Sequence, residues 1–455
     1  MMRIRLVIAM TLAVCALGAT AQNTDIEALS GLNFNFGNPG ARALGMGGAF
    51  LGMADDSSAA EANPAGLTAL VRPEITLELR NSKTLQSLAT EGNFDPAVPS
   101  SVTYDDFTSF SRNAEVAFGS FVLPKGNWRI AGYFHSVLEF ENEANAIFKQ
   151  NQFGAITIND LRFYVGPNGY VNLDDCVALG SQCSGYRLFP YFTGVNVDLE
   201  TWGLALAYKV SDNFSIGAAY KYQKFTEEAA TLRTTFTNPI TPLAFIAQTA
   251  DDDDYSYSIG FKLGSPRSKW NLGGVYKTGG SFSTSNVLGL YNNQGELATL
   301  EETSRPQFNV PDVYGLGLSY NPVPPLRINV DAVQVNYSDL VDDVQSIYTG
   351  VQANPQYVRE DVTEIHVGAE WFFINSRIPW AIRAGWWQDP EHSLKWAGPI
   401  TNGDQAAVGI VFPEGEDRDH YSIGIGVAFT NLQVDAAYDT SDKYKVGSIS
   451  AKYVF

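Results

Sequence analysis

The chain of 455 residues is poor in the side chains that build most active sites and metal centres. It holds three cysteines and four histidines, and none of the histidines, at positions 135, 366, 392 and 420, lies in a recognisable nucleophile motif. His135 and Ser136 cannot act as a base and its nucleophile within a strand, because neighbouring side chains there point to opposite faces. The sequence therefore predicts that the protein is not an enzyme and has no cofactor and no metal site.

Charge is also scarce, and it is unbalanced. Charged residues make up 17% of the chain, against about 25% in soluble domains. The net charge of −19 excludes nucleic acid as a partner, because phosphate repels such a surface. After the first residues no apolar run is long enough for a spanning helix, so a membrane crossing would have to use strands. Aromatic residues and glycine are plentiful, with 27 Phe, 22 Tyr and 41 Gly.

Residues 1–21 have the pattern of a secretory signal peptide. Arg3 and Arg5 precede an apolar stretch at 6–19, which is too short to span a bilayer. Ala19-Thr20-Ala21 then forms a small-residue cleavage site. We therefore expect the chain to be exported and cleaved after Ala21.

Two cysteines would remain in the exported chain, Cys176 and Cys183, within the polar stretch DDCVALGSQC. An exported pair this close in sequence predicts one disulfide that closes a loop. The alternative is a metal site, which is disfavoured because no histidine or second cysteine pair lies nearby.

A run of four aspartates occupies residues 251–254. Such a run could hold Ca²⁺ or bridge lipopolysaccharide through divalent ions. The oxygen-ligand spacing of a dedicated calcium loop is missing, however, so the composition favours a solvated loop.

The body of the chain alternates between apolar residues and small or polar ones, which is the period of a β-strand. One face of the segment 202–208 carries Trp202, Leu204, Leu206 and Tyr208, and the other carries Gly203, Ala205 and Ala207. A soluble sandwich would place charge rather than glycine and serine on its polar face. Fourteen segments share the pattern, at 74–80, 113–123, 127–140, 201–210, 213–225, 254–264, 268–277, 312–320, 325–337, 362–374, 377–388, 418–429, 431–440 and 447–455.

The connections between these segments alternate between short and long. The short ones are tight turns at 124–126, 211–212, 265–267, 321–324, 375–376 and 430–431, and the long ones lie at 141–200, 226–253, 278–311, 338–361 and 389–417. Short turns at one rim and long loops at the other are typical of outer-membrane barrels. The array therefore predicts an all-β, 14-stranded antiparallel transmembrane barrel.

Residues 38–67, NPGARALGMGGAFLGMADDSSAAEANPAGL, fit neither a helix nor a strand. The stretch combines glycines that allow positive φ and close backbone approach, aspartates that cap turns, and an Asn-Pro step that favours a turn. These residues are Gly45, Gly47, Gly48, Asp55, Asp56, Asn63 and Pro64. A compact segment ahead of a strand array suggests a plug inside a barrel.

The motifs ARALGMGGAF, ADDSSA and NPAGL in this stretch resemble the N-terminal hatch of the FadL-type long-chain fatty acid transporters of outer membranes. PorV-like barrels carry a closely related signature. The resemblance implies a hatch at 22–70 inside a barrel at 71–455, placed in the bacterial outer membrane among lipid and lipopolysaccharide. The aromatic end at Phe455 resembles the C-terminal insertion signal of such barrels.

The resemblance also implies passive uptake of hydrophobic small molecules, most plausibly long-chain fatty acids or related hydrocarbons, by a protein that we expect to be a monomer. Loops would capture the ligand, a lumenal pocket would hold it, and a bend in the third strand, at Gly132, would release it sideways. Residues 243–247 would supply part of an apolar loop groove. A PorV-like docking or shuttle role in secretion is the alternative, and a water-filled porin is disfavoured because a hatch would block its bore.

Alternation places several charges on the inward face. The candidates for an anionic head group are Arg383, Arg42 in the hatch, Arg327 and Lys221, with Arg383 foremost because a guanidinium grips a carboxylate through two hydrogen bonds. The competing interpretation is that these cations pair with inward acids and hold the hatch in place. The inward set is Lys221, Lys262, Arg327, Asp331, His366, Glu370, Arg383, Asp435 and Lys452.

Overall fold

The structure is a computed structural model of the whole chain. It describes residues 37–87, 103–104, 108–146, 148–149, 161–166, 169–171, 178, 184–188, 191–234, 242–265, 268–292, 296–303, 307–342, 357–393, 395–397 and 415–455. The expected signal peptide and the expected Cys176–Cys183 disulfide lie outside the described residues.

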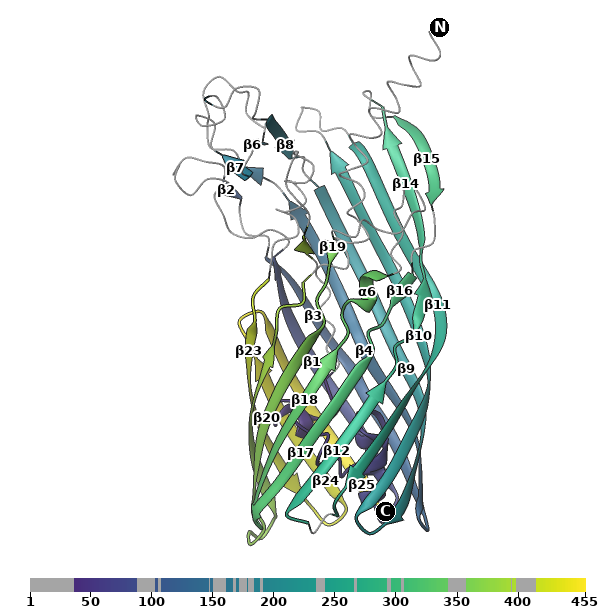
Figure 1. Cartoon of the computed structure of the whole chain (residues 1–455), viewed down its shortest axis with the longest axis vertical. Helices are drawn as coiled ribbons and strands as arrows, with labels where there is room; N and C mark the ends of the chain where they lie inside the picture. The colour runs from purple at the N-terminus through teal and green to yellow at the C-terminus, as the bar shows by residue number, and fades with distance from the viewer. Residues whose placement is uncertain are drawn as a thin grey trace.

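A closed antiparallel barrel forms the body of the molecule (Figure 1). Sixteen described strands share one sheet. Two of them, β14 (Ser285–Tyr291) and β15 (Leu297–Thr303), form a hairpin beside β11. The other fourteen close into a ring, because β10 pairs with both β9 and β11. The 14-stranded prediction is confirmed. The ring strands are β1 (Glu74–Ser87), β3 (Thr108–Lys125), β4 (Trp128–Ala146), β9 (Tyr191–Ser211), β10 (Phe214–Thr234), β11 (Pro242–Leu263), β12 (Trp270–Lys277), β17 (Val313–Val323), β18 (Leu326–Val335), β20 (Val362–Phe373), β21 (Trp380–Asp389), β23 (Arg418–Ala428), β24 (Leu432–Thr440) and β25 (Tyr444–Val454).

The short turns gather at one rim, beside the C-terminus, and the longer connections rise from the other (Figure 1). No helix in the described part of the chain is long and apolar enough to cross a membrane. The longer connections carry small elements: β2 (Thr103–Tyr104), β5 (Phe148–Lys149), β6 (Leu161–Gly166), β7 (Gly169–Val171), β8 (Ser184–Leu188), β13 (Ser281–Ser283), β16 (Gln307–Asn309), α6 (Asp339–Asp342), β19 (Tyr357–Val358) and β22 (Lys395–Trp396).

Three neighbouring strands, β9, β10 and β11, are much longer than the sequence predicted, and the expected loop at 226–253 is wrong. Residues 243–247 are part of β11, where Ala244 pairs with Leu290 of β14, so they are not a loop groove. The acidic run also lies in β11, and Asp252 and Asp254 accept hydrogen bonds from the backbone of β13. Aspartates are tolerated in these strands because their exposed side chains remain hydrated beyond the membrane.

Two belts of aromatic side chains mark the membrane boundaries on the outer wall. Near the turn rim, Trp128 packs on Tyr208 with ring centroids 4.6 Å apart, and Trp270 stacks on Tyr320 at 3.8 Å. Six residues further along β4, Phe134 meets Trp202 at 5.5 Å in the second belt. Trp202 therefore lies in the middle of β9 rather than near its end, and β9 continues for eleven more residues toward the loop side.

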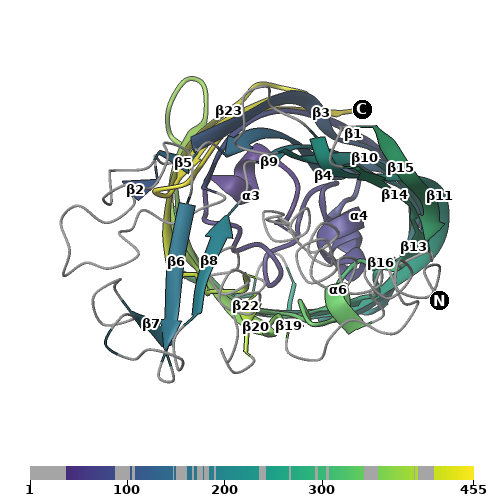
Figure 2. The ribbon, with the colours of Figure 1, turned by 90° about the horizontal axis from the view of Figure 1, so that it is seen from above.

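The first described segment, residues 37–70, lies inside the ring and is here called the inner segment (Figure 2). It contains α3 (Ala41–Leu44), α4 (Ala59–Ala62) and the 3₁₀ helix η1 (Pro64–Ala69), which Asn63 caps by accepting a hydrogen bond from the Ala65 backbone N–H. Almost all of the segment is buried. Its backbone touches the wall where both sides are glycine: Gly45 lies against Gly424, and a Cβ on Gly385 would overlap Gly47.

Candidate functional site: the lumen of the barrel

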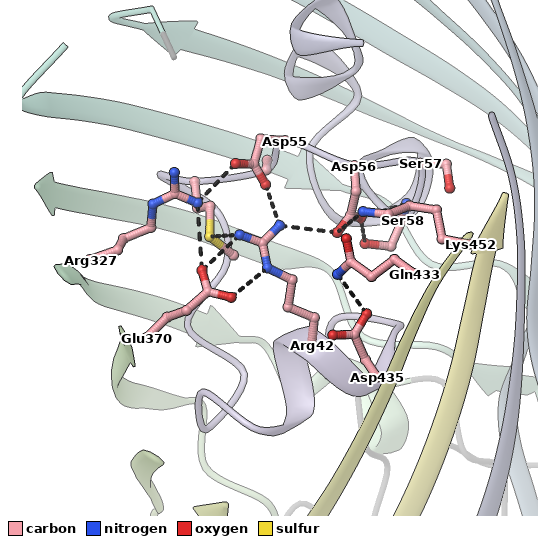
Figure 3. Close-up of polar contacts among 12 residues, drawn as sticks. Arg42, Asp55, Asp56, Ser57, Ser58, Arg327, Glu370, Gln433, Asp435 and Lys452 are labelled. Carbon is pink, nitrogen blue, oxygen red and sulfur yellow. Dashed lines mark hydrogen bonds and ion pairs between the residues drawn. The ribbon is translucent and has the colours of Figure 1, made fainter. Parts of the chain in front are cut away.

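Arg42 of α3 is the centre of a buried charge network between the inner segment and the wall (Figure 3). Its guanidinium donates two hydrogen bonds to Glu370 of β20, from Nε at 3.0 Å and Nη2 at 2.8 Å. Nη1 donates to Asp55 at 2.6 Å. Burial alone would raise the pKa of the Asp55 carboxyl, but the nearby guanidinium groups of Arg42 and Arg327 hold that pKa far below its usual range. Asp55 is therefore held in its charged form, and the network ties two parts of the inner segment to one strand.

The other two predicted arginines join the same network. Arg327 contacts Asp55 at 2.9 Å and Glu370 at 3.7 Å. Arg383 pairs with Glu370 at 2.8 Å and with Asp435 at 2.8 Å, and its side chain is 1% exposed. Asp56 also lies 3.4 Å from Arg42, so the three guanidinium groups face four carboxylates. This arrangement favours the structural interpretation, in which the cations hold the inner segment, because none of the three arginines faces the lumen without an acidic partner.

Further wall residues bind the backbone of the inner segment. Asp331 accepts hydrogen bonds from the N–H groups of Phe50 at 2.6 Å and Leu51 at 2.7 Å. His366 Nδ1 lies 2.7 Å from the Gly47 carbonyl oxygen, and Asn329 donates to the Ala49 carbonyl at 2.9 Å. The sequence predicted that Asp331 and His366 face inward. Asn329 was missed, although it lies two residues before Asp331 on β18 and therefore faces the same side of the strand.

A second polar cluster surrounds Glu61 of α4, on the opposite side of the lumen from most of the arginine network. Glu61 accepts a hydrogen bond from the Tyr133 hydroxyl at 2.8 Å and one from Lys277 at 3.1 Å, and Lys221 lies 3.7 Å away. The four side chains come from α4, β4, β10 and β12. Lys221 was predicted as a candidate; Glu61 and Lys277 were not. Strand alternation could have placed Lys277 inside, but nothing local marks Glu61.

Beyond this cluster, toward the loop side, buried apolar side chains gather in the lumen, together with a few buried charged ones such as Glu227 and Arg359. A buried cluster combines inward residues of the wall with side chains from the inturned connections, and Phe225 of β10 stacks on Phe282 and Phe308 with centroids 5.1 and 4.5 Å apart. We call this set the upper cluster. Its buried members are Leu138, Phe140, Val195, Val197, Leu199, Phe225, Phe282, Phe308, Val310, Val313, Val335, Tyr337, Leu340 and Val362.

The wall changes its pairing next to the upper cluster. In the described residues, β3 and β4 pair from Lys125–Trp128 to Phe118–His135 and no further, although β3 continues along β1 and β4 continues along β9. The β4–β9 register shifts between Ser136 and Leu138, which leaves Val137 as a bulge. Gly132, where the bend was predicted, is paired on both sides without a shift. The irregularity therefore lies four to six residues beyond the predicted position.

These features agree with the comparisons to known proteins. The sequence model of the outer membrane protein transport proteins (OMPP1/FadL/TodX) matches residues 32–448. The chain belongs to this family. Members of the family are outer-membrane β-barrels that act as transport channels for hydrophobic compounds, and this chain is an outer-membrane β-barrel of that family. No curated protein sequence matches the chain.

Solved structures of the FadL type share the fold at low sequence identity. A Pseudomonas aeruginosa FadL homologue is 15% identical with a TM-score of 0.64, covering 93% of this chain and 100% of that one. The Ralstonia pickettii toluene transporter TbuX is 15% identical with a TM-score of 0.54, covering 92% and 99%. The P. putida toluene transporter TodX is 13% identical with a TM-score of 0.57, covering 92% and 99%. At these identities the likeness establishes the fold alone.

Proposed function

We propose that the protein takes up hydrophobic molecules passively through the upper cluster and releases them sideways between β3 and β4. The observation that carries this proposal is the contact between the two features: Leu138 and Phe140 belong to the upper cluster and follow the Val137 bulge directly. A greasy solute in this cluster is thus already beside the part of the wall where β3–β4 pairing has ended.

The physical requirement is an apolar path across a polar barrier. Lipopolysaccharide and its bound ions slow the passage of hydrophobic solutes into the membrane. Moving apolar surface from water into an apolar environment, in contrast, is favourable by about 25 cal/mol per Å². A lumen lined by phenylalanine and branched aliphatic side chains offers such burial. A sideways exit keeps the solute out of water, because it passes from the cluster to the hydrocarbon of the bilayer.

The inner segment acts as the hatch in this proposal. It lies inside the barrel toward the turn rim (Figure 1), and its ion pairs and glycine contacts join it to the wall on several strands. A straight passage to the periplasmic side is thereby blocked. Residues 22–36, ahead of the described part, would belong to the same hatch, and residues 1–21 to a cleaved signal peptide.

The substrate class follows from the relatives and the lining together. TbuX and TodX are named as toluene transporters, and CymD as a monoaromatic hydrocarbon channel. For this chain we propose long-chain fatty acids or related hydrocarbons, taken up by a monomer that lipid and lipopolysaccharide surround. A PorV-like docking role would not require a buried apolar cluster inside the lumen, so the upper cluster favours transport.

Deletion of Val137 tests this route. Removing the bulge residue brings Ser136 and Leu138 into continuous register with β9, so we expect β4 to straighten and to pair further with β3. Uptake of radiolabelled oleate by cells that produce the variant should fall at least tenfold, while the amount of folded, heat-modifiable barrel stays the same. Gly132→Ala is the matched control and should keep normal uptake, because nothing lies within 4 Å of a Cβ at that position. Normal uptake by the Val137 deletion would refute the sideways exit.

A further inference from the structure

One acidic side chain lies within the upper cluster itself. Glu227 of β10 pairs with Val197 of β9 on one side and with Ala250 of β11 on the other. Residues directly opposite each other in a ladder share a face, and Phe225 and Ala229, two positions away along β10, face the same way. Val197 and Phe225 belong to the upper cluster, and Ala229 and Ala250 pack against it. The wall around the Glu227 side chain is therefore apolar on all four sides.

The Glu227 carboxyl is buried without a partner. The residue is 3% exposed, and its Oε2 has no hydrogen-bond partner in the described structure. Burial raises the pKa of this carboxyl to about 7, and no nearby charge counteracts the effect. Glu61 and Glu370, in contrast, are held by lysines and arginines. Buried polar groups are normally satisfied and destabilise the fold when they are not, so the fold alone gives no reason for an acid at this position.

Glu227 lies outside the membrane, on the loop side of the lumen. Tyr222, five residues earlier on β10, packs on Trp202 of the second aromatic belt with ring centroids 5.9 Å apart. The inner segment is held by β10 further toward the turn rim, through the ion pair of Lys221 with Glu61. Six positions along a strand separate Lys221 from Glu227, which is roughly 20 Å at 3.3 Å per residue. The carboxyl therefore faces whatever occupies the upper cluster rather than the inner segment.

The surroundings of Glu227 decide which chemical group suits it. An anionic group would be repelled by the ionised carboxyl. An ammonium group would have to lose its water among apolar neighbours, and a buried ion pair offsets that loss only where further hydrogen bonds support it. A hydroxyl group is neutral and loses less on burial when it finds a partner. It can donate a hydrogen bond to the carboxyl in either protonation state.

We propose that Glu227 makes the upper cluster selective for apolar molecules that carry a hydroxyl group, such as long-chain alcohols. The hydroxyl donates to the Glu227 carboxyl, while the hydrocarbon packs against Phe225 and Val197. This inference rests on the proposed uptake of hydrophobic molecules and names the members of that class which the lumen prefers. A molecule without the hydroxyl would cover the carboxyl and leave it unpartnered, and a site built to bond a hydroxyl rejects an analogue that lacks one.

Binding of radiolabelled 1-decanol and undecane to the detergent-solubilised full chain tests the proposal. The probes have the same length and differ in a terminal hydroxyl or methyl group, and each affinity is referred to the partition of that probe into protein-free micelles. On this scale the wild-type chain should prefer decanol. Glu227→Leu removes the carboxyl and keeps an apolar side chain, so undecane should bind about five- to a hundred-fold more tightly and decanol should not. The preference for decanol should thereby fall about tenfold or more.

Two further variants separate selectivity from a structural role. Glu227→Gln keeps a donor and an acceptor without charge, so the preference for decanol should stay within about threefold of the wild type. Glu228→Leu is the matched control: the next residue on β10 is exposed, and its loss should leave both affinities unchanged. Thermal unfolding of each variant verifies that it is folded.

Three results would overturn the selectivity while leaving the proposed function standing. They are an equal change of both affinities in Glu227→Leu, an unchanged preference in that variant, and tighter binding of decylammonium than of decanol by the wild-type chain. If the wild-type chain binds neither decanol nor undecane above the micelle blank, the proposed function fails and this inference fails with it.

Discussion

Glycine occupies both sides of the contact between the inner segment and the barrel wall. Gly47 has φ of 64°, which glycine adopts without strain, and its backbone lies against Trp386 and Gly385 of β21. Gly317 of β17 touches Gly52 in the same way. These contacts are between backbones, so no side chain can rotate away to make room. The close approach therefore requires glycine at each position, and at Gly47 the positive φ favours glycine as well.

Replacing Gly385 tests this packing at a single residue. A Cβ there would overlap the Gly47 backbone nitrogen, so Gly385→Ala should force the inner segment to shift and lower the free energy of unfolding by about 1–3 kcal/mol. Thermal unfolding and protease cleavage of the inner segment report the change. Gly132→Ala, also a strand glycine, has open space around its Cβ and should leave both measurements unaltered. Equal stability of the two variants would contradict the close approach.

At the scale of elements, alternation predicted which way the strand residues face, but not what they touch. Glu370, Arg383 and Asp435 face inward as expected, because parity along a strand is a local property. Their partners depend on register between strands and on where α3 lies, and both are tertiary. The foremost head-group candidate, Arg383, was therefore placed correctly and still found in ion pairs, whereas Lys277 and Glu61 were missed.

The lengths of the strands on the loop side could not be predicted from the sequence either. Residues 242–253 pair with β10 along the stretch, and residues 244–249 also pair with β14. Four consecutive aspartates nevertheless have low strand propensity and predicted a loop. Outside the membrane, pairing with long neighbours outweighs propensity, because charged side chains stay in water. The bulge at Val137 could likewise not be predicted from the sequence, because valine itself favours regular strands. The register shift arises from the pairing of β4 with β9.

Deleting residues 38–69, most of the inner segment, tests its role as a hatch. The ring strands pair with one another without it, so we expect the variant barrel still to insert into outer membranes. Inward charges such as Glu370 and Arg383 would then face water, and small polar solutes should pass. Conductance in planar bilayers should rise well above that of the full-length protein. An inserted variant that conducts no more than the full-length barrel would show that the segment is not a plug.

At the scale of the whole molecule, the barrel has three zones along its axis. The inner segment fills the part within the aromatic belts, the Lys221–Lys277 cluster lies above α4, and the upper cluster extends toward the long loops. Strands β9 to β11 continue past the second belt and enclose the upper cluster. In this arrangement the apolar upper cluster lies above a polar cluster. It also lies beside the part of the wall where β3 and β4 stop pairing with each other.

The central claim, passive uptake of hydrophobic solutes, is tested most directly by selectivity in proteoliposomes that contain the purified full-length chain. Entry of radiolabelled oleate should exceed that into protein-free vesicles at least severalfold, while entry of a small sugar such as arabinose stays at background. Phe225→Gln, which places an amide in the upper cluster, should reduce oleate entry without admitting the sugar. Oleate entry equal to that of protein-free vesicles, or rapid sugar entry through the wild-type barrel, would contradict the account.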